Sequence, residues 1–200
     1  MSLIFYQEGT EIKVEEKKPR TRILDVGCGD KPHPRAFACG DLYLEISTHR
    51  NTDRVIQPKK LRNFVRFDCH HLPFKTGSFD IVYANHVLEH LENPLNALKE
   101  WRRVARKVIV LTPDLRGIMA EERTSHMYTW SRWSLENLLR KVFKKVQVEE
   151  RVHPLLWERL GLTPRLFNYV TKRFLWRFFV FSTLELVGVA EDPIREKLSL

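Results

Sequence analysis

The sequence has few cysteines and no long apolar run. Its three cysteines, Cys28, Cys39 and Cys69, are an odd number and include no Cys-x-x-Cys pair. That pattern argues against a disulfide framework or a structural zinc site, and it is typical of reduced thiols in a cytoplasmic protein. No apolar run approaches the roughly 20 residues that a membrane-spanning helix needs, and the first residues lack the layout of a secretory signal. We therefore expect a cytoplasmic protein without a membrane span.

Positive charge is abundant and unevenly distributed. The net charge is +9, and residues 140–177 hold ten Lys and Arg against three Glu. Such a concentration is found on surfaces that bind RNA or another polyanion, and it also arises where a protein only needs solubility. The sequence leaves both interpretations open. It is equally silent on the oligomeric state.

Short apolar runs alternate with helical patterns along most of the chain. Helical spacing follows the Asn93-Pro94 pair, which is a typical helix start, and continues in a second segment over 134–142. Nearly continuous apolar character is typical of strands covered on both faces, and the alternation favours a doubly wound, largely parallel α/β sheet. The predicted strands are 22–26, 41–46, 64–67, 79–84, 107–111, 146–152 and 181–190.

The length fits one domain over 1–200, with two segments that stand apart. Residues 1–20 look like an N-terminal extension. Residues 153–181 mix aromatic and basic side chains, and we expect them to select the acceptor. They could form a lid helix, an RNA-contacting surface, or a helix that buries its apolar face on the sheet.

Polar or glycine residues follow four of the predicted strands. The Asp25–Gly29 segment ends the first strand with a glycine pair, which lets a ligand approach the backbone. Glu45 ends the second predicted strand sixteen residues after Gly29, near the spacing at which an acidic residue meets ribose hydroxyls. Asp68 follows the third strand and Asn85 the fourth. In a parallel sheet these ends share one edge, which is where ligands bind.

Four ordered motifs lie within residues 22–114. They are the glycine segment, Leu72-Pro73-Phe74, Ser78-Phe79-Asp80 and His86-Val87-Leu88-Glu89-His90-Leu91. Together they resemble the class I S-adenosylmethionine (SAM)-dependent methyltransferases, and they are most similar to the branch with an "LPF…SFD…HVLEHL" signature. The resemblance implies an enzyme with SAM as its cofactor and a Rossmann-like, mostly parallel seven-stranded sheet whose last strand is antiparallel.

The same resemblance implies a SAM pocket at the strand ends. Gly27 and Gly29 would approach the methionine part of the cofactor, and Asp25 would order their loop. Glu45 would hold the ribose hydroxyls, and Asp68 would face the adenine amino group.

The reacting end of the pocket falls on the segment after the fourth strand. The backbone of Cys69 would lie beside the adenine, whereas Asn85 and His86 would lie near the sulfonium. A hydroxyl or protonated amine needs a base before it can accept a methyl group. The candidates are His86, His90 and His126, with His86 first because it directly follows the strand.

One alternative involves a metal ion. Glu89 and His90 share a helical turn with His86, and His126 comes later. This set resembles the metal-assisted 2′-O-methyltransferases of small-RNA 3′ ends. However, His86 stands where that group has a first Glu, and the "HVLEHL" segment is common in relatives without metal. We therefore expect no metal site.

Two features depart from the family pattern. Pro32 and Pro34 leave little room for a helix after the glycine loop, and residues 103–107 run into the fifth strand without the usual glycine turn. The pattern as a whole predicts methyl transfer to a small molecule. The alternatives are an RNA acceptor, or a non-catalytic cofactor- or RNA-binding protein of the same fold.

Overall fold

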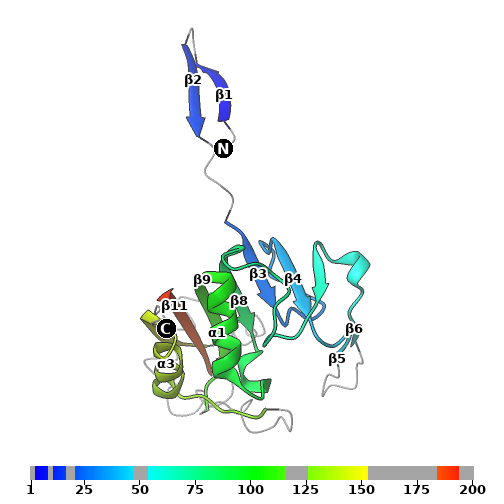
Figure 1. The fold of residues 1–200 in the computed structure, drawn as a ribbon, viewed down its shortest axis with the longest axis vertical. Coiled ribbons are helices and arrows are strands. Elements are labelled where there is room, and N and C mark those ends of the chain that lie inside the picture. The colour runs from blue at the N-terminus through cyan, green and yellow to red at the C-terminus, as the bar shows by residue number, and fades with distance from the viewer. Residues whose placement is uncertain are drawn as a thin grey trace, which may run out of the picture.

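A seven-stranded sheet forms the centre of the molecule (Figure 1). The computed structural model describes residues 3–8, 11–16, 21–46, 54–115, 126–152 and 184–193. β11 is antiparallel to both its neighbours, whereas the strands from β9 to β7 are parallel, so the predicted Rossmann-like sheet is confirmed. In spatial order the strands are β10 (Phe143–Val152), β11 (Leu184–Pro193), β9 (Ala105–Pro113), β8 (Phe79–Asn85), β3 (Ile23–Val26), β4 (Ala38–Asp41) and β7 (Phe64–Arg66).

The register of the parallel strands brings their carboxyl ends to one edge. Val26 of β3 pairs with Ala84 of β8 on one side and with Gly40 of β4 on the other. Asp41 pairs in turn with Arg66 of β7. The loops that leave β3, β4, β7 and β8 therefore start side by side, which is where open parallel sheets bind ligands.

Two helices begin at side-chain caps, the first of which the sequence indicated. α1 (Pro94–Val104) starts at Asn93, whose side chain accepts a hydrogen bond from the Asn96 amide at 3.0 Å. α3 (Arg132–Arg140) starts two residues before the predicted segment, at a capping box formed by Ser131 and Ser134. α1 ends at Val104 and β9 begins at the next residue, as the missing glycine turn indicated.

The prediction of a second strand over 41–46 is wrong. That strand is β4, which ends where the predicted one began. Within β4, Gly40 has no room for a side chain, because a Cβ there would overlap the Val65 carbonyl and the Phe67 ring of the neighbouring chain segment. Glu45 belongs to β5 (Glu45–Ile46), which pairs with β6 (Arg54–Val55) in a separate sheet. As expected, no helix lies between β3 and β4.

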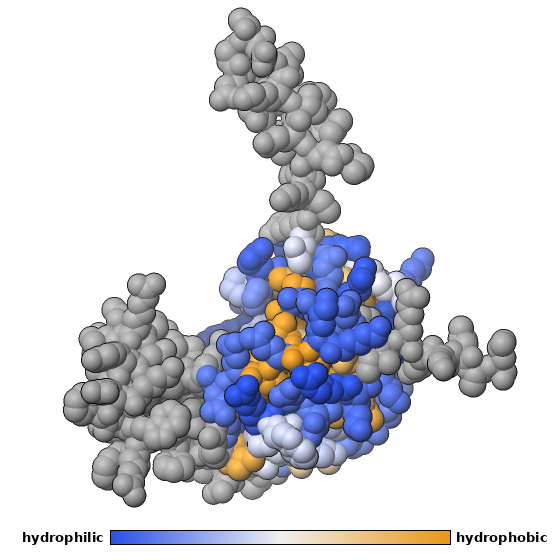
Figure 2. Space-filling model, turned by 90° about the vertical axis from the view of Figure 1, so that its left-hand side faces the viewer, coloured by the Kyte–Doolittle hydropathy of each residue, from blue (hydrophilic) through white to orange (hydrophobic). Residues whose placement is uncertain are grey.

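The remaining elements lie outside the main sheet. β1 (Leu3–Glu8) and β2 (Glu11–Glu16) form a two-stranded sheet within the predicted N-terminal extension. The predicted acceptor-selecting segment, 153–181, lies outside the described residues. Among the described helices, none is long and apolar enough to cross a membrane. One face of the molecule shows a band of apolar residues across a largely hydrophilic surface (Figure 2).

We expect Trp101→Phe to lower the free energy of unfolding by about 1–3 kcal/mol, because it leaves a buried carbonyl without its donor. Trp101 is fully buried on α1, and its indole Nε1 donates to the Cys69 carbonyl at 3.0 Å. Urea unfolding measures the change, and Trp133→Phe is the matched control because that side chain is 74% exposed. Equal stability of the two variants would show that the bond to Cys69 contributes nothing.

Candidate functional site

The glycine loop that follows β3 has a backbone that only glycine adopts readily. Gly27 and Gly29 have φ angles of +65° and +55°, in the left-handed region. A Cβ at Gly27 would also overlap the side chain of Val87, so the loop lies directly against the segment that follows β8. Both the φ angle and the packing therefore favour glycine at position 27, and the φ angle favours it at position 29.

Two aspartate side chains hold this loop by accepting hydrogen bonds from its backbone amides. Asp25 Oδ2 accepts a hydrogen bond from the His33 amide at 2.6 Å, and Asp41 Oδ2 accepts one from the Gly29 amide at 3.0 Å. The Cys28 amide also donates to the Gly40 carbonyl at 3.1 Å. The predicted ordering role of Asp25 fits this geometry. Asp41 was not among the predicted site residues.

Asp25 is buried, and its carboxyl has a raised pKa. Burial raises the pKa of its carboxyl to about 7, the His33 hydrogen bond lowers it, and the nearby Asp41 carboxylate raises it again. A carboxyl with such a pKa changes its charge near neutral pH, next to the loop that it positions.

Asp68 lies at the same edge, two residues past β7. Its Oδ1 accepts from both the amide and the Nδ1 of His70, each at 2.8 Å, and His71 Nδ1 lies 3.8 Å from Oδ2. Burial alone would raise the pKa of Asp68, but the hydrogen bonds from His70 hold it below its ordinary value. The result is a half-exposed carboxylate beside the Cys69 backbone, whose carbonyl already accepts from Trp101.

Asn85 is the last residue of β8, one residue beyond the predicted strand, and His86 directly follows it. The two side chains differ in exposure. Asn85 is exposed, whereas His86 is held in a left-handed conformation with φ +54°, and its amide donates to the Leu111 carbonyl at 2.9 Å. The His86 ring lies between two buried carboxylates, with Nδ1 3.2 Å from Glu89 and Nε2 3.1 Å from Glu185. Burial lowers the pKa of His86, but the two carboxylates outweigh it and raise that pKa to about 9.

Glu185 was missed because it comes from β11, far along the chain from His86. The available indication was an acidic residue inside the apolar first half of the strand, which is unusual unless the charge is paired. Asp41 was missed because the apolar residues after it were assigned to the strand. Its indication was its place directly after the small residues Ala38, Cys39 and Gly40.

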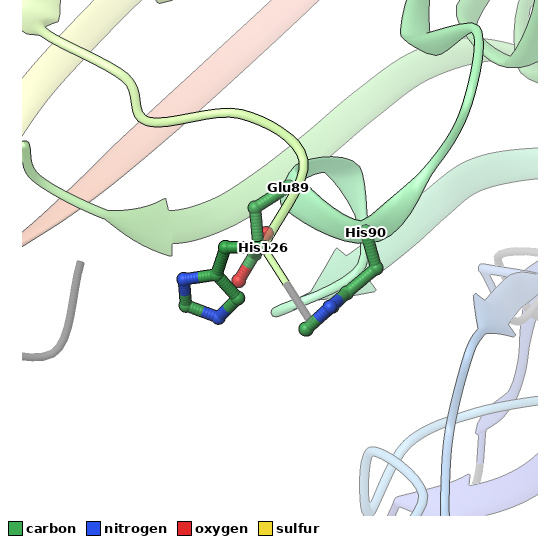
Figure 3. Close-up of side chains that lie close together, drawn as sticks. All are labelled: Glu89, His90 and His126. Atoms are coloured by element: carbon green, nitrogen blue, oxygen red, sulfur yellow. The ribbon is translucent and has the colours of Figure 1, made fainter. Parts of the chain in front are cut away.

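Glu89, His90 and His126 come together beside His86 (Figure 3). Glu89 and His90 lie on η2 (Leu88–His90), and the amides of Met127 and Tyr128 donate to the Glu89 carbonyl, which fixes the His126 segment there. One ligand atom from each of the three side chains lies within 4.8 Å of the others. The candidate bases therefore separate into two groups: His86 between carboxylates, and His90 with His126 at the cluster.

The comparisons with known proteins agree with this arrangement. A family described as "Methyltransferase domain" matches residues 24–109, which contain the glycine loop, β8, η2 and α1. Residues 24–109 are therefore similar to a methyltransferase domain. This match agrees with the predicted resemblance to methyltransferases, and the particular signature branch stays a prediction.

Individual relatives match only in part. The uncharacterized protein MJ0638 of Methanocaldococcus jannaschii is 32% identical over 60% of this chain and 53% of its own length. The mitochondrial ubiquinone biosynthesis O-methyltransferase of Saccharomyces cerevisiae is 27% identical over 49% of this chain and 34% of its own. The chain thus spans about half or less of the length of these relatives.

The fold is shared with solved methyltransferase structures. One is a SAM-dependent methyltransferase, a possible histamine N-methyltransferase, of Thermotoga maritima, with a TM-score of 0.56 at 16% identity. The match covers 88% of this chain and 84% of that one.

We expect Asp25→Asn to flatten the pH dependence of stability. The pKa of Asp25 is higher in the folded chain than its ordinary value of 3.8, so its contribution to stability is largest below pH 3.8 and is lost as the pH rises toward 7. The full difference amounts to at most about 4 kcal/mol, and the amide lacks it because it never ionises.

Urea unfolding from pH 4 to pH 8 measures this difference. The control is Asp80→Asn, an exposed aspartate that accepts from the Arg22 amide at the opposite end of the sheet. If Asp25→Asn and the unmodified chain keep parallel stability curves, Asp25 does not titrate in this range.

Proposed function

We propose that this chain transfers a methyl group from SAM to a small-molecule acceptor, in the cytoplasm. The observation that carries the proposal is that the glycine loop lies next to the cluster of Glu89, His90 and His126, with Gly27 in contact with Val87 between them. Asp25 and Asp41 hold the loop in this position. The loop offers a cofactor site, and the cluster lies where a second substrate would meet the methyl group. The cytoplasmic assignment is supported by the cysteines, which are all free and buried.

The proposed adenosine pocket uses the two acidic strand ends. Asp41 ends β4 beside the Gly29 amide, so we place the ribose hydroxyls against Asp41; Glu45 lies in the separate β5–β6 sheet. A carboxylate accepts hydrogen bonds from two neighbouring hydroxyls at once. Asp68 is the proposed acceptor for the adenine amino group, with the Cys69 backbone beside it.

The proposed catalytic residues are His90 and His126. His86 has both ring nitrogens directed at buried carboxylates, so it is suited to holding η2 and β11 in place. Asn85 is exposed at the end of β8 and is proposed to contact the methionine end of the cofactor. Alignment and exclusion of water would supply much of the rate, because the sulfonium already carries a good leaving group.

RNA remains the second candidate acceptor. Of the basic stretch 140–177, only residues up to 152 are described, and two of its cations have acidic partners there. Arg140 pairs with Glu136 at 2.6 Å and Lys145 with Asp192 at 2.9 Å. This pairing favours a structural role for those charges and supports the small-molecule acceptor over RNA.

We expect Asp41→Ala and Asp68→Ala each to weaken SAM binding by about tenfold or more, since each removes charged hydrogen bonds worth roughly 1.4 kcal/mol or more. Isothermal titration calorimetry of the purified chain measures the dissociation constant, with Asp80→Ala as control. Glu45→Ala is measured beside them. Normal SAM binding by Asp41→Ala together with weak SAM binding by Glu45→Ala would assign the ribose contact to Glu45 instead of Asp41.

We expect tritium from methyl-labelled SAM to appear in a metabolite extract and to be insensitive to ribonuclease. Total RNA, with and without ribonuclease, is the parallel substrate. Label that enters RNA and disappears with ribonuclease would establish the RNA acceptor. A chain that gives no heat with SAM and no shift in melting temperature would instead be a non-catalytic protein of this fold.

A further inference from the structure

The Glu89–His90–His126 cluster has the composition and spacing of a metal-ion site. One oxygen and two imidazole nitrogens lie within 4.8 Å of one another, and the rings of His90 and His126 have centroids 4.7 Å apart at 69° (Figure 3). Ligand atoms around a tetrahedral zinc ion are roughly 3.3 Å apart. The ligand atoms of the cluster are at most 4.8 Å apart, and one of them belongs to His90, which is only partly buried.

The backbone assembles this cluster from two separate segments. The Met127 and Tyr128 amides donate to the Glu89 carbonyl at 2.8 and 3.2 Å, so the residue after His126 is fixed to the turn that carries Glu89. The His90 amide donates to the Val87 carbonyl at 3.0 Å. Hydrogen bonds between backbone groups therefore bring the three side chains together.

The surroundings of Glu89 match those of a ligand carboxylate. The residue is 1% exposed, and Thr112 Oγ1 donates to its Oε2 at 3.0 Å. Its buried Oε1 lies 3.2 Å from Nδ1 of His86. Such partners orient a ligating carboxylate.

We infer that Glu89, His90 and His126 bind one divalent transition-metal ion whose open position takes the hydroxyl oxygen of the acceptor. Two imidazoles and one carboxylate are a typical ligand set for zinc, iron or manganese, and three protein ligands leave a position for a substrate. This inference rests on the proposed function, and it replaces the expectation of a metal-free site. It also narrows the acceptor to a compound methylated on oxygen.

The ion would activate the acceptor in place of a protein base. On binding the metal, the hydroxyl loses its proton to water, because a bound divalent cation lowers the pKa of a coordinated oxygen. The resulting oxygen forms a bond to the methyl carbon while the carbon–sulfur bond breaks. The electron pair of that bond stays on sulfur, which leaves S-adenosylhomocysteine and a methyl ether.

The position of the cluster beside the glycine loop supports this step. Val87 contacts Gly27 on one side and accepts from the His90 amide on the other. A ligand bound at the loop and an oxygen bound at the cluster would therefore lie next to each other, beside Val87.

The test is metal binding by the whole chain after chelator treatment. Zn²⁺, Mn²⁺ and Co²⁺ are titrated separately by calorimetry, and Co²⁺ is also followed by its visible absorption, which reports imidazole and carboxylate coordination directly. We expect one ion per chain, and binding weakened at least about tenfold in His90→Ala and in His126→Ala. His71→Ala, which removes an exposed histidine outside the cluster, should bind the ion normally.

SAM titration of each variant separates the possible failures. His90→Ala and His126→Ala chains that still bind SAM are folded, so their loss of metal would be local. A chain that binds SAM but none of the three ions, or a His126→Ala variant that binds them as well as the unmodified chain, overturns the metal site and leaves the proposed function standing. A chain that binds the metal but not SAM overturns the proposed function instead.

Discussion

The contact between Gly27 and Val87 joins the two halves of the site, and most of its geometry depends on it. Gly27 has a left-handed φ and no Cβ, so the loop after β3 can lie against the first residue after His86. Any larger residue would push the loop away from η2, which carries Glu89 and His90. Interiors pack too tightly to absorb such a displacement without a shift elsewhere. The absence of a side chain at Gly27 therefore keeps the glycine loop in contact with the segment that carries the histidine cluster.

Buried charge is concentrated at the same edge and is costly to the fold. Asp25, Glu89 and Glu185 are each at most 2% exposed, and desolvation opposes their ionisation. Hydrogen bonds from His33 and Thr112, and the imidazole of His86, compensate part of that cost. Buried ionisable groups seldom increase stability, so their accumulation where four strands end is more consistent with binding and chemistry than with folding.

The sequence predicted the elements whose pattern is local and failed where the cause is distant. The Asn93 cap and the buried run of β3 follow from neighbouring residues, and both are as predicted. β4 was misplaced because it is short and contains Gly40, and the constraint on Gly40 comes from Val65 and Phe67, which follow much later in the chain. Glu45 was assigned to the ribose hydroxyls because it was taken to end that strand. Glu185 pairs with His86 across 99 positions, and no periodicity reports such a contact.

The chemistry of the cofactor explains why an acidic edge suits this chain despite its net charge of +9. Nucleotide sites in similar folds place a helix N-terminus against phosphate, and no helix follows the glycine loop here. SAM has no phosphate, and its sulfonium and amino groups are cationic, so a carboxylate such as Asp41 would attract it. Methyl transfer converts the sulfonium into a neutral thioether, which removes one positive charge from the bound molecule. Such a carboxylate would therefore hold the substrate more tightly than the product, and the edge that binds the cofactor would also favour release of the product.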